Sequence, residues 1–319
     1  MALQTSGAIS LNDLHVEAGG SSGTLCSLND ADIRGIINKS VNASNAFSEY
    51  RGQSAETSLP TGGSQINGQV QLKEITVSDY ISSGETLRIP SSMWVWSDST
   101  STPALIIDIS CTVINDGKVI GKGGEGGWGF STGPTAGGPA ISVTASGVTI
   151  INSSGAYIAG GGGGGGAYSD YSNPSDAHAG GGGGAGGGKG GRGRINQGYW
   201  QQGPGGILNA SGGAGGNGSG GAGGGAGGAG GGHQGGGGGG GRILPGVGGG
   251  GGNSAGDGGS AGNAGVSGGP YVFSLAGGGG GWGAAGGLGG GRYGGAAGGA
   301  AISGTSRTLS NSGTIYGGT

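Results

Sequence analysis

Long runs of glycine restrict the possible fold of this chain more than any other feature. Residues 212–241 read GGAGGNGSGGAGGGAGGAGGGHQGGGGGGG, and 98 of the 319 residues are glycine, most of them after residue 120. Such a stretch lacks the side chains that build a hydrophobic core, an amphipathic helix or an alternating strand. This part of the chain therefore folds through its backbone groups or does not fold.

A flexible linker is the first alternative for the glycine runs. Linkers usually mix glycine with serine, whereas here the partner of glycine is alanine. Bulky segments also interrupt the runs, and an exposed spacer has no use for large aromatic side chains. These segments lie at residues 128–135, 167–178, 194–202, 242–247 and 270–276. A collagen helix is excluded because there is no Gly-X-Y period and only nine prolines occur in the chain.

A bundle of polyglycine II helices is the remaining packed arrangement. This left-handed helix shares the polyproline II geometry, with about three residues per turn and no internal hydrogen bonds. Its N–H and C=O groups point outward in three directions, so neighbouring helices without side chains can approach and satisfy them. We expect an interior made of backbone hydrogen bonds, in which a run such as 160–166 spans roughly 20 Å.

Composition divides the chain into three regions, which we expect to be three domains. Residues 1–60 have an ordinary mixed sequence and form an attachment region. Residues 61–120 contain short, alternating, β-branched runs bounded by turn signals, typical of a small β-domain. Residues 121–319 form the glycine-rich domain. The expected fold class is mostly irregular and β, with a short helix near the N-terminus and β end-caps on the polyglycine II bundle.

The first region contains one predicted helix. Ser27 can cap its N-terminus, Asp30 and Asp32 lie in an acidic first turn, and Lys39 lies near its end. A helix this short is marginal in water, and the region around it offers little to pack against. We therefore expect it to dock on a partner.

The β region carries two pattern-based predictions. In MWVWSD, Trp94 and Trp96 fall on one face of a strand, and Asn115-Asp116-Gly117 has the chemistry of a hairpin turn. Residues 115–121, 152–158 and 311–317 are imperfect repeats that read apolar residue, Asn, turn, Gly, apolar pair. We interpret them as strand–turn units that launch or close the bundle.

Charge and cysteine content exclude several classes of protein. The formal charge is −3 and no basic run occurs, which argues against a nucleic-acid partner. Cys26 and Cys111 are too few for a disulfide framework, and no metal-ligand spacing is present. No membrane span and no signal peptide are recognisable, so we expect synthesis in a cytoplasm without Sec export. No cofactor is expected.

Glycine runs that alternate with aromatic-bearing loops resemble the distal adhesins that cap the tail fibres of T-even-like enterobacterial phages. MWVWSDSTSTPALIIDISCTVINDGKVIGKGGEGG is similar to segments of phage tail proteins, and residues 1–40 resemble a virion-attachment N-terminus. The resemblance implies a polyglycine II sandwich whose loops contact a receptor at the bacterial surface. It also implies a place on the virion tail, attachment to a tail or tail-fibre protein through residues 1–60, and an outer-membrane protein or surface glycan of the host as receptor.

Aromatic side chains in the glycine-rich region are the candidate receptor contacts, because they provide large contact area at low entropic cost. They are Trp128, Phe130, Tyr168, Tyr171, Tyr199, Trp200, Tyr271, Phe273, Trp282 and Tyr293. Some of them could instead cover the open faces of the bundle or lie at the end that faces the fibre.

Two other functions compete with the adhesin. A glycine-rich structural or ice-binding protein would need a flat face of small residues, which the bulky irregular loops disfavour. A polysaccharide depolymerase would need a catalytic constellation. The pair Asp170 and Asp176 has nothing around it that could shift a pKa. We therefore expect that the protein is not an enzyme.

Overall fold

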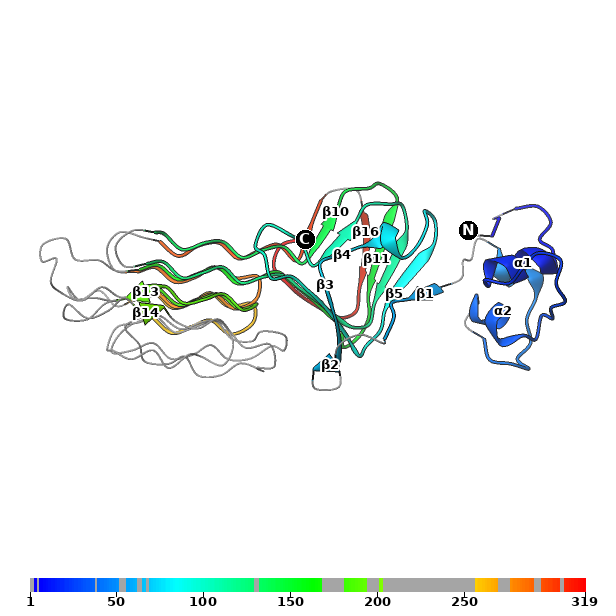
Figure 1. Cartoon of the computed structure of the whole chain (residues 1–319), viewed down its shortest axis with the longest axis horizontal. Helices are drawn as coiled ribbons and strands as arrows, with labels where there is room; N and C mark the ends of the chain where they lie inside the picture. Colours follow the sequence, from blue (N-terminus) through cyan, green and yellow to red (C-terminus); the bar gives the residue numbers. More distant parts are fainter. Residues whose placement is uncertain are drawn as a thin grey trace, which may run out of the picture.

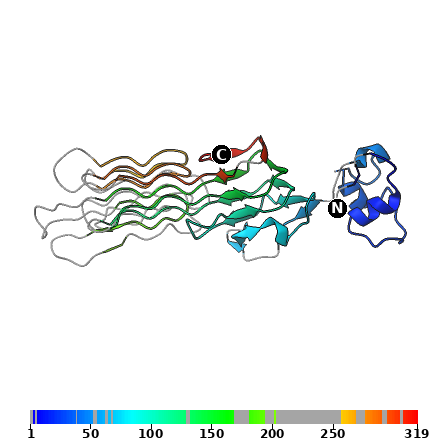
Figure 2. The same cartoon turned by 90° about the horizontal axis from the view of Figure 1, so that it is seen from above.

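The protein is elongated in the computed structural model, with helices at one end, β-sheets in the middle and glycine-rich segments at the other end (Figures 1 and 2). The structure describes residues 3–4, 6–37, 39–51, 56–61, 65–66, 69–128, 132–167, 181–193, 201–202, 256–268, 276–289, 294–304 and 307–319. In this part the fold is mostly β, with short helices confined to the N-terminal region apart from the 3-10 turn η2 (Val77–Asp79).

The N-terminal region is a small helical unit with its own core. It contains α1 (Leu11–Glu17), α2 (Ala31–Gly35) and the 3-10 helix η1 (Phe47–Tyr50). Helix α1 begins with a capping box, in which the Ser10 hydroxyl accepts from Asp13 N–H and the Asp13 carboxylate accepts from Ser10 N–H. The Asp13 carboxylate accepts hydrogen bonds from Ser10 N–H and from the Ser10 hydroxyl, and both lower the pKa of Asp13. The core side chains are Leu3, Leu14, Ile33, Ile36 and Tyr50.

The start of the predicted helix is wrong by three residues. Helix α2 begins at Ala31, after Asp30, and not after Ser27. The Asp30 carboxylate accepts a hydrogen bond from Ser27 N–H at 2.7 Å, so both residues stabilise the turn that precedes the helix. Because α2 packs in the core shared with α1, it does not need a partner to be buried, and that argument for docking does not hold.

Parallel strands form three sheets, each with strands from distant parts of the sequence. The first sheet has the order β1 (Glu56–Ser58), β5 (Thr86–Ile89), β8 (Thr112–Asn115), β11 (Val148–Asn152), β16 (Arg307–Asn311). The second has β17 (Thr314–Tyr316), β12 (Tyr157–Ala159), β9 (Lys118–Ile120), β6 (Met93–Trp96), β3 (Gln69–Lys73), β2 (Gln65–Ile66). The third has β15 (Ile302–Ser303), β10 (Ile141–Val143), β7 (Leu105–Ile107), β4 (Ile75–Thr76).

The chain winds through these sheets as a three-faced β-solenoid. It passes from the first sheet to the second and then to the third, as in β5, β6 and β7, and then begins the next coil. All pairings in the three sheets are parallel except β2 with β3. The sheets draw on strands from residue 56 to residue 316, so the β region extends well beyond residues 61–120.

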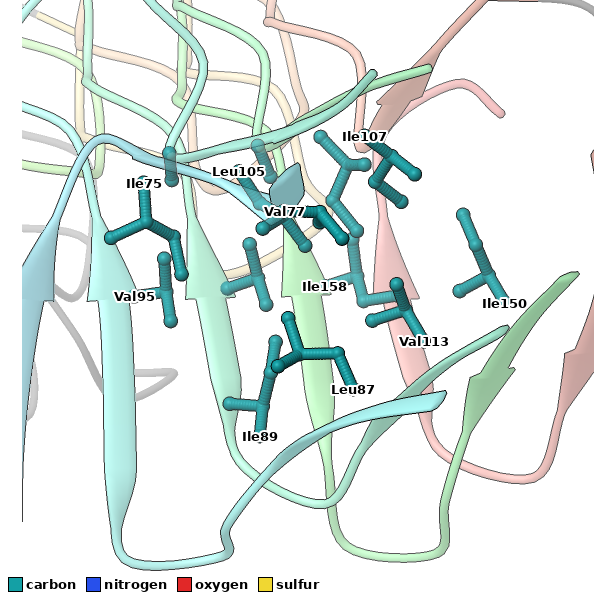
Figure 3. Close-up of a cluster of buried hydrophobic side chains, with 14 of the residues drawn as sticks. Ile75, Val77, Leu87, Ile89, Val95, Leu105, Ile107, Val113, Ile150 and Ile158 are labelled. Atoms are coloured by element: carbon teal, nitrogen blue, oxygen red, sulfur yellow. The ribbon is translucent and has the colours of Figure 1, made fainter. Parts of the chain in front are cut away.

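Alternating side chains fill the interior of the solenoid. Strand β11 has buried residues at every second position, and β5 and β8 repeat the pattern. Side chains from different coils converge on one cluster between the sheets (Figure 3). On β6, Met93 and Val95 point into this cluster, which leaves Trp94 and Trp96 on the outer face. The prediction that the two tryptophans share one face of a strand is confirmed.

Three asparagines stack in register inside the corner where the chain leaves the first sheet. Asn115, Asn152 and Asn311 are aligned on β8, β11 and β16. Asn115 Nδ2 donates to Asn152 Oδ1 and Asn152 Nδ2 donates to Asn311 Oδ1, each at 2.8 Å. Asn152 and Asn311 lie 159 residues apart in sequence, so this asparagine ladder fixes the register of coils separated by the whole glycine-rich insertion.

The hairpin predicted at Asn115-Asp116-Gly117 is wrong. Strand β8 belongs to the first sheet and β9 to the second, so the turn is a corner of the solenoid and its two flanking strands do not pair. The three predicted repeats do occupy equivalent positions, because β8–β9, β11–β12 and β16–β17 are successive copies of this corner. Their strand–turn character is confirmed.

Loss of the central asparagine should destabilise the solenoid. Asn152 is fully buried and also donates to Thr314 O, so the substitution Asn152→Ala leaves polar groups of its neighbours without partners. We expect a loss of about 1–3 kcal/mol in the free energy of unfolding, measured by denaturant titration. Asn311→Ala is the matched control and should cost less, because Asn311 is exposed and water can replace its side chain. Equal losses for both variants would contradict the ladder.

Candidate recognition surface

Both glycine-rich insertions leave the solenoid at the same corner, between the second and third sheets. The first connects β9 to β10 and the second connects β12 to β15, whereas the equivalent connection from β6 to β7 is short. The described glycine segments then run side by side away from the sheets (Figures 1 and 2).

Segment 160–166 is the centre of the described glycine-rich part. Its successive N–H groups donate to three different neighbouring segments, and every third residue returns to the same neighbour. The donor and acceptor pairs are Gly161 with Gly138 and Gly164 with Thr135, then Gly162 with Ala185 and Gly165 with Gly182, then Gly163 with Ala284 and Gly166 with Gly287. Their N···O distances lie between 2.7 and 3.0 Å. The backbone groups of this segment are thus satisfied entirely from outside it.

These hydrogen bonds require glycine on the segment that is surrounded. A Cβ on Gly161 would lie 1.9 Å from Lys122 O, and one on Gly163 would lie 2.0 Å from Ala296 O. Alanine occurs where a segment faces outward, as at the exposed Ala285 and Ala297, and also buried at some segment ends, as at Ala185. The spacing between segments is therefore set by the absence of side chains.

The end of the glycine segments nearest the solenoid is held by an apolar contact. Trp282 and Ala185 pack with Trp94, Ile120 and Ala159 on the outer face of the second sheet. The Trp282 ring lies edge-on to Tyr157 and Tyr316, with centroid distances of 6.3 and 5.6 Å. These contacts join the glycine segments to the solenoid.

Trp282 is therefore not available as a receptor contact. Its side chain is fully buried, and its place in the junction with the solenoid accounts for its size. The expectation that it reaches a receptor is corrected here, because an indole without accessible surface cannot contact another protein or a glycan.

The opposite end of the segments brings together residues that flank three of the bulky interruptions. Gly127 N–H donates to Gly165 O, Gly181 N–H donates to Gly127 O, and Gly277 N–H donates to Gly166 O, at distances of 2.8 to 3.0 Å. These residues flank the interruptions at 128–135, 167–178 and 270–276. The chain therefore leaves the described segments for these three interruptions from one shared end.

Of the aromatic candidates, Trp128 lies among the described residues at this end. It is half-buried, and its backbone N–H donates to Thr132 O at 2.8 Å in an isolated antiparallel β-bridge. Phe130, Tyr168, Tyr171, Tyr199, Trp200, Tyr271, Phe273 and Tyr293 lie outside the described residues.

Two exposed apolar residues on the side of the glycine segments were missed by the sequence reasoning. Val266 is 54% exposed and Leu288 is 58% exposed, and their segments are joined by a hydrogen bond from Gly268 N–H to Leu288 O. Each is a single bulky apolar residue inside a run of small residues, and this pattern could have indicated an exposed apolar contact. Both lie near the same end as Trp128.

The described residues offer no cluster of histidine, cysteine or acidic side chains that could hold a metal ion. Within the same residues, the helices are all too short or too polar to cross a membrane.

Comparison with known proteins identifies the chain. The sequence model of the phage tail fibre adhesin Gp38 family matches residues 64–234, more than half of the chain. The chain belongs to this family. It is therefore a bacteriophage tail fibre adhesin and a component of the virion tail fibre, as the sequence resemblance implied.

Other comparisons are more distant. No curated protein matches the adhesin. Among solved structures, it is similar to the crystal structure of the gp37-gp38 adhesin tip complex of the bacteriophage S16 long tail fibre. The match has 19% identity and a TM-score of 0.46, and it covers 98% of this chain and 99% of that chain.

A methyl group on the central glycine segment should disrupt the adhesin. In Gly164→Ala the new Cβ would lie 1.9 Å from Glu125 O, so the segments must separate. We expect a loss of about 1–3 kcal/mol or more in the free energy of unfolding. In the control Gly294→Ala, the nearest atom is Leu288 Cδ2 at 3.5 Å, and the change should stay within about 0.5 kcal/mol. Denaturant unfolding measures both, and a tolerated Gly164→Ala would refute the close packing.

Proposed function

We propose that the adhesin recognises a receptor on the host cell through loops at the far end of a stiff block of polyglycine II helices. The receptor is an outer-membrane protein or a surface glycan. The observation that carries the proposal is that described residues flanking three aromatic interruptions meet at the end of the glycine segments that points away from the solenoid.

The period of the backbone hydrogen bonds supports the polyglycine II assignment. A helix with about three residues per turn presents every third N–H group in the same direction. Residues 161 and 164 share one neighbouring segment, and residues 162 and 165 share another. In an α-helix the backbone N–H groups bond within the helix, and in a β-sheet they bond to two neighbouring strands. Neither structure directs the N–H groups of one segment to three different neighbours.

Stiffness of the block matters because binding has an entropic cost. A loop that is held in position loses less freedom on binding than a free one, so more of its contact energy becomes affinity. Aromatic residues add large buried area with few rotatable bonds. The proposed contacts are Trp128, Phe130, Tyr168, Tyr171, Tyr199, Trp200, Tyr271, Phe273 and Tyr293.

Exchange of two loops tests this proposal. Replacement of residues 168–178 and 194–200 by glycine and serine should abolish binding of the purified adhesin to susceptible cells and its competition with phage adsorption. The unfolding midpoint should change little, because the hydrogen-bonded segments are retained. The control Asn263→Ser lies in an exposed turn at the solenoid end and should bind as the wild type does. Undiminished binding after the exchange would disprove the loop assignment.

For the opposite end of the molecule, the proposed partner is a tail or tail-fibre protein that docks on residues 1–60. Large apolar side chains are exposed there, namely Val16, Leu25, Val41 and Phe47. Val16 also lines a groove, together with Leu3, Ile9, Asn12 and Glu17. Exposed apolar residues gathered on one small unit are typical of an interaction surface.

The docking surface is tested by Leu25→Asp. Leu25 is fully exposed, so the substitution should leave the fold intact and weaken co-purification with the distal tail-fibre protein of the same phage. A loss of about tenfold in affinity is expected for one buried apolar contact replaced by a charge. Leu288→Asp, an exposed leucine on the glycine segments, is the matched control and should co-purify normally. Normal assembly of the Leu25 variant would argue against this surface.

A further inference from the structure

The outer face of the second sheet carries a row of three nitrogen donors. Gln71 on β3 is in register with Trp94 on β6, and Trp94 is in register with Lys118 on β9. Neighbouring strands lie about 4.8 Å apart, so these long side chains can converge on one group placed beside the Trp94 indole N–H.

Among the residues that the structure describes, none of the three donors has an acceptor. Gln71 Nε2 and Trp94 Nε1 are buried and make no hydrogen bond. Lys118 is half-buried, and in the part of the chain that the structure describes no carboxylate is paired with it. Buried polar groups of native proteins are nearly always satisfied, so two orphan donors beside an uncompensated ammonium require an explanation.

A second lysine of the same sheet has its charge compensated by a carboxylate. Lys73 on β3 is exposed and pairs with Asp98 at 2.9 Å, which raises the pKa of Lys73. Burial instead lowers the pKa of Lys118. The Lys118 ammonium lies over the Trp94 ring, 5.9 Å from its centroid, and is weakly attracted to it. This contact provides no acceptor for the Trp94 indole N–H.

The chemistry of this donor row selects its ligand. Gln71 Nε2, Trp94 Nε1 and Lys118 Nζ can only donate, and the ammonium repels cations, so the group complementary to these three atoms is an anion that only accepts. A carboxylate has two oxygen atoms with about four acceptor positions, enough for an amide, an indole and an ammonium together. We infer that Gln71, Trp94 and Lys118 form a binding site for the carboxylate of a ligand from outside the chain.

The site is separate from the proposed receptor loops. It lies on the solenoid, beside the junction where Trp94 packs with Trp282 and Ala185. Lys118 is more accessible than Trp94, which is only 3% exposed, so the ligand reaches the row from the lysine side. Failure of the loop exchange and failure of this site are therefore distinguishable results.

The test uses NMR of the indole N–H groups in the full-length adhesin. Titration with acetate should move the Trp94 Nε1–H resonance downfield in a saturable way and raise the pKa of Lys118. Methyl glucuronate, phosphate and chloride are parallel arms. If methyl glucuronate binds much more tightly than acetate, the natural ligand is an acidic sugar. If the two bind with comparable affinity, the site recognises the carboxylate alone. Saturation by phosphate alone would overturn the carboxylate assignment.

Variants locate the binding to the row. Lys118→Met should weaken acetate binding by about tenfold or more, while the exposed Lys189→Met control should bind like the wild type. Gln71→Glu places a carboxylate inside the site and should block acetate binding while the protein stays folded. This second variant keeps the inference testable if Lys118→Met unfolds the protein. No saturable shift with any anion, or unchanged affinity in both row variants, would overturn the inference.

Discussion

The hydrogen bond between backbone groups of adjacent glycine segments is the interaction on which the rest of the molecule depends. It forms because nothing but hydrogen atoms separates the segments, as at Gly161 and Gly163. Ordering a residue costs about 1–2 kcal/mol, and a net hydrogen bond returns about 0.5–1.5 kcal/mol. These opposing contributions are similar in size, so the glycine segments need an anchor whose stability comes from elsewhere.

The solenoid provides that anchor. Its interior is an ordinary apolar core, and its coils are aligned by Asn115, Asn152 and Asn311. Every glycine segment that starts or ends on the solenoid does so at one corner. Trp282 and Ala185 then fasten the reversals at the near end to the outer face of the second sheet. The helical unit at the N-terminus has a separate core, and the exposed apolar residues outside that core form the proposed docking surface.

Sequence reasoning could predict features that depend on local chemistry. Glycine runs without side chains implied backbone bonding, alternating runs implied strands, and the repeated asparagine corners were visible as repeats. The hairpin at Asn115-Asp116-Gly117 failed because the turn signal is local, whereas the partners of β8 are strands distant in sequence. The burial of Trp282 could not be predicted from the sequence. Successive glycine segments run in opposite directions, so the number of preceding segments decides whether Trp282 lies at the solenoid end or at the far end. The aromatic loops outside the described residues remain predictions.

The common corner has a consequence for how such proteins vary. Each excursion departs from the coil and comes back to the same place, so a pair of antiparallel glycine segments with its tip can be added or removed without changing the strand that follows. The connection from β6 to β7 shows the coil closing without any excursion. Insertions and deletions can therefore change the number and length of the glycine segments and the loops at their far end, while the solenoid and the N-terminal region stay the same.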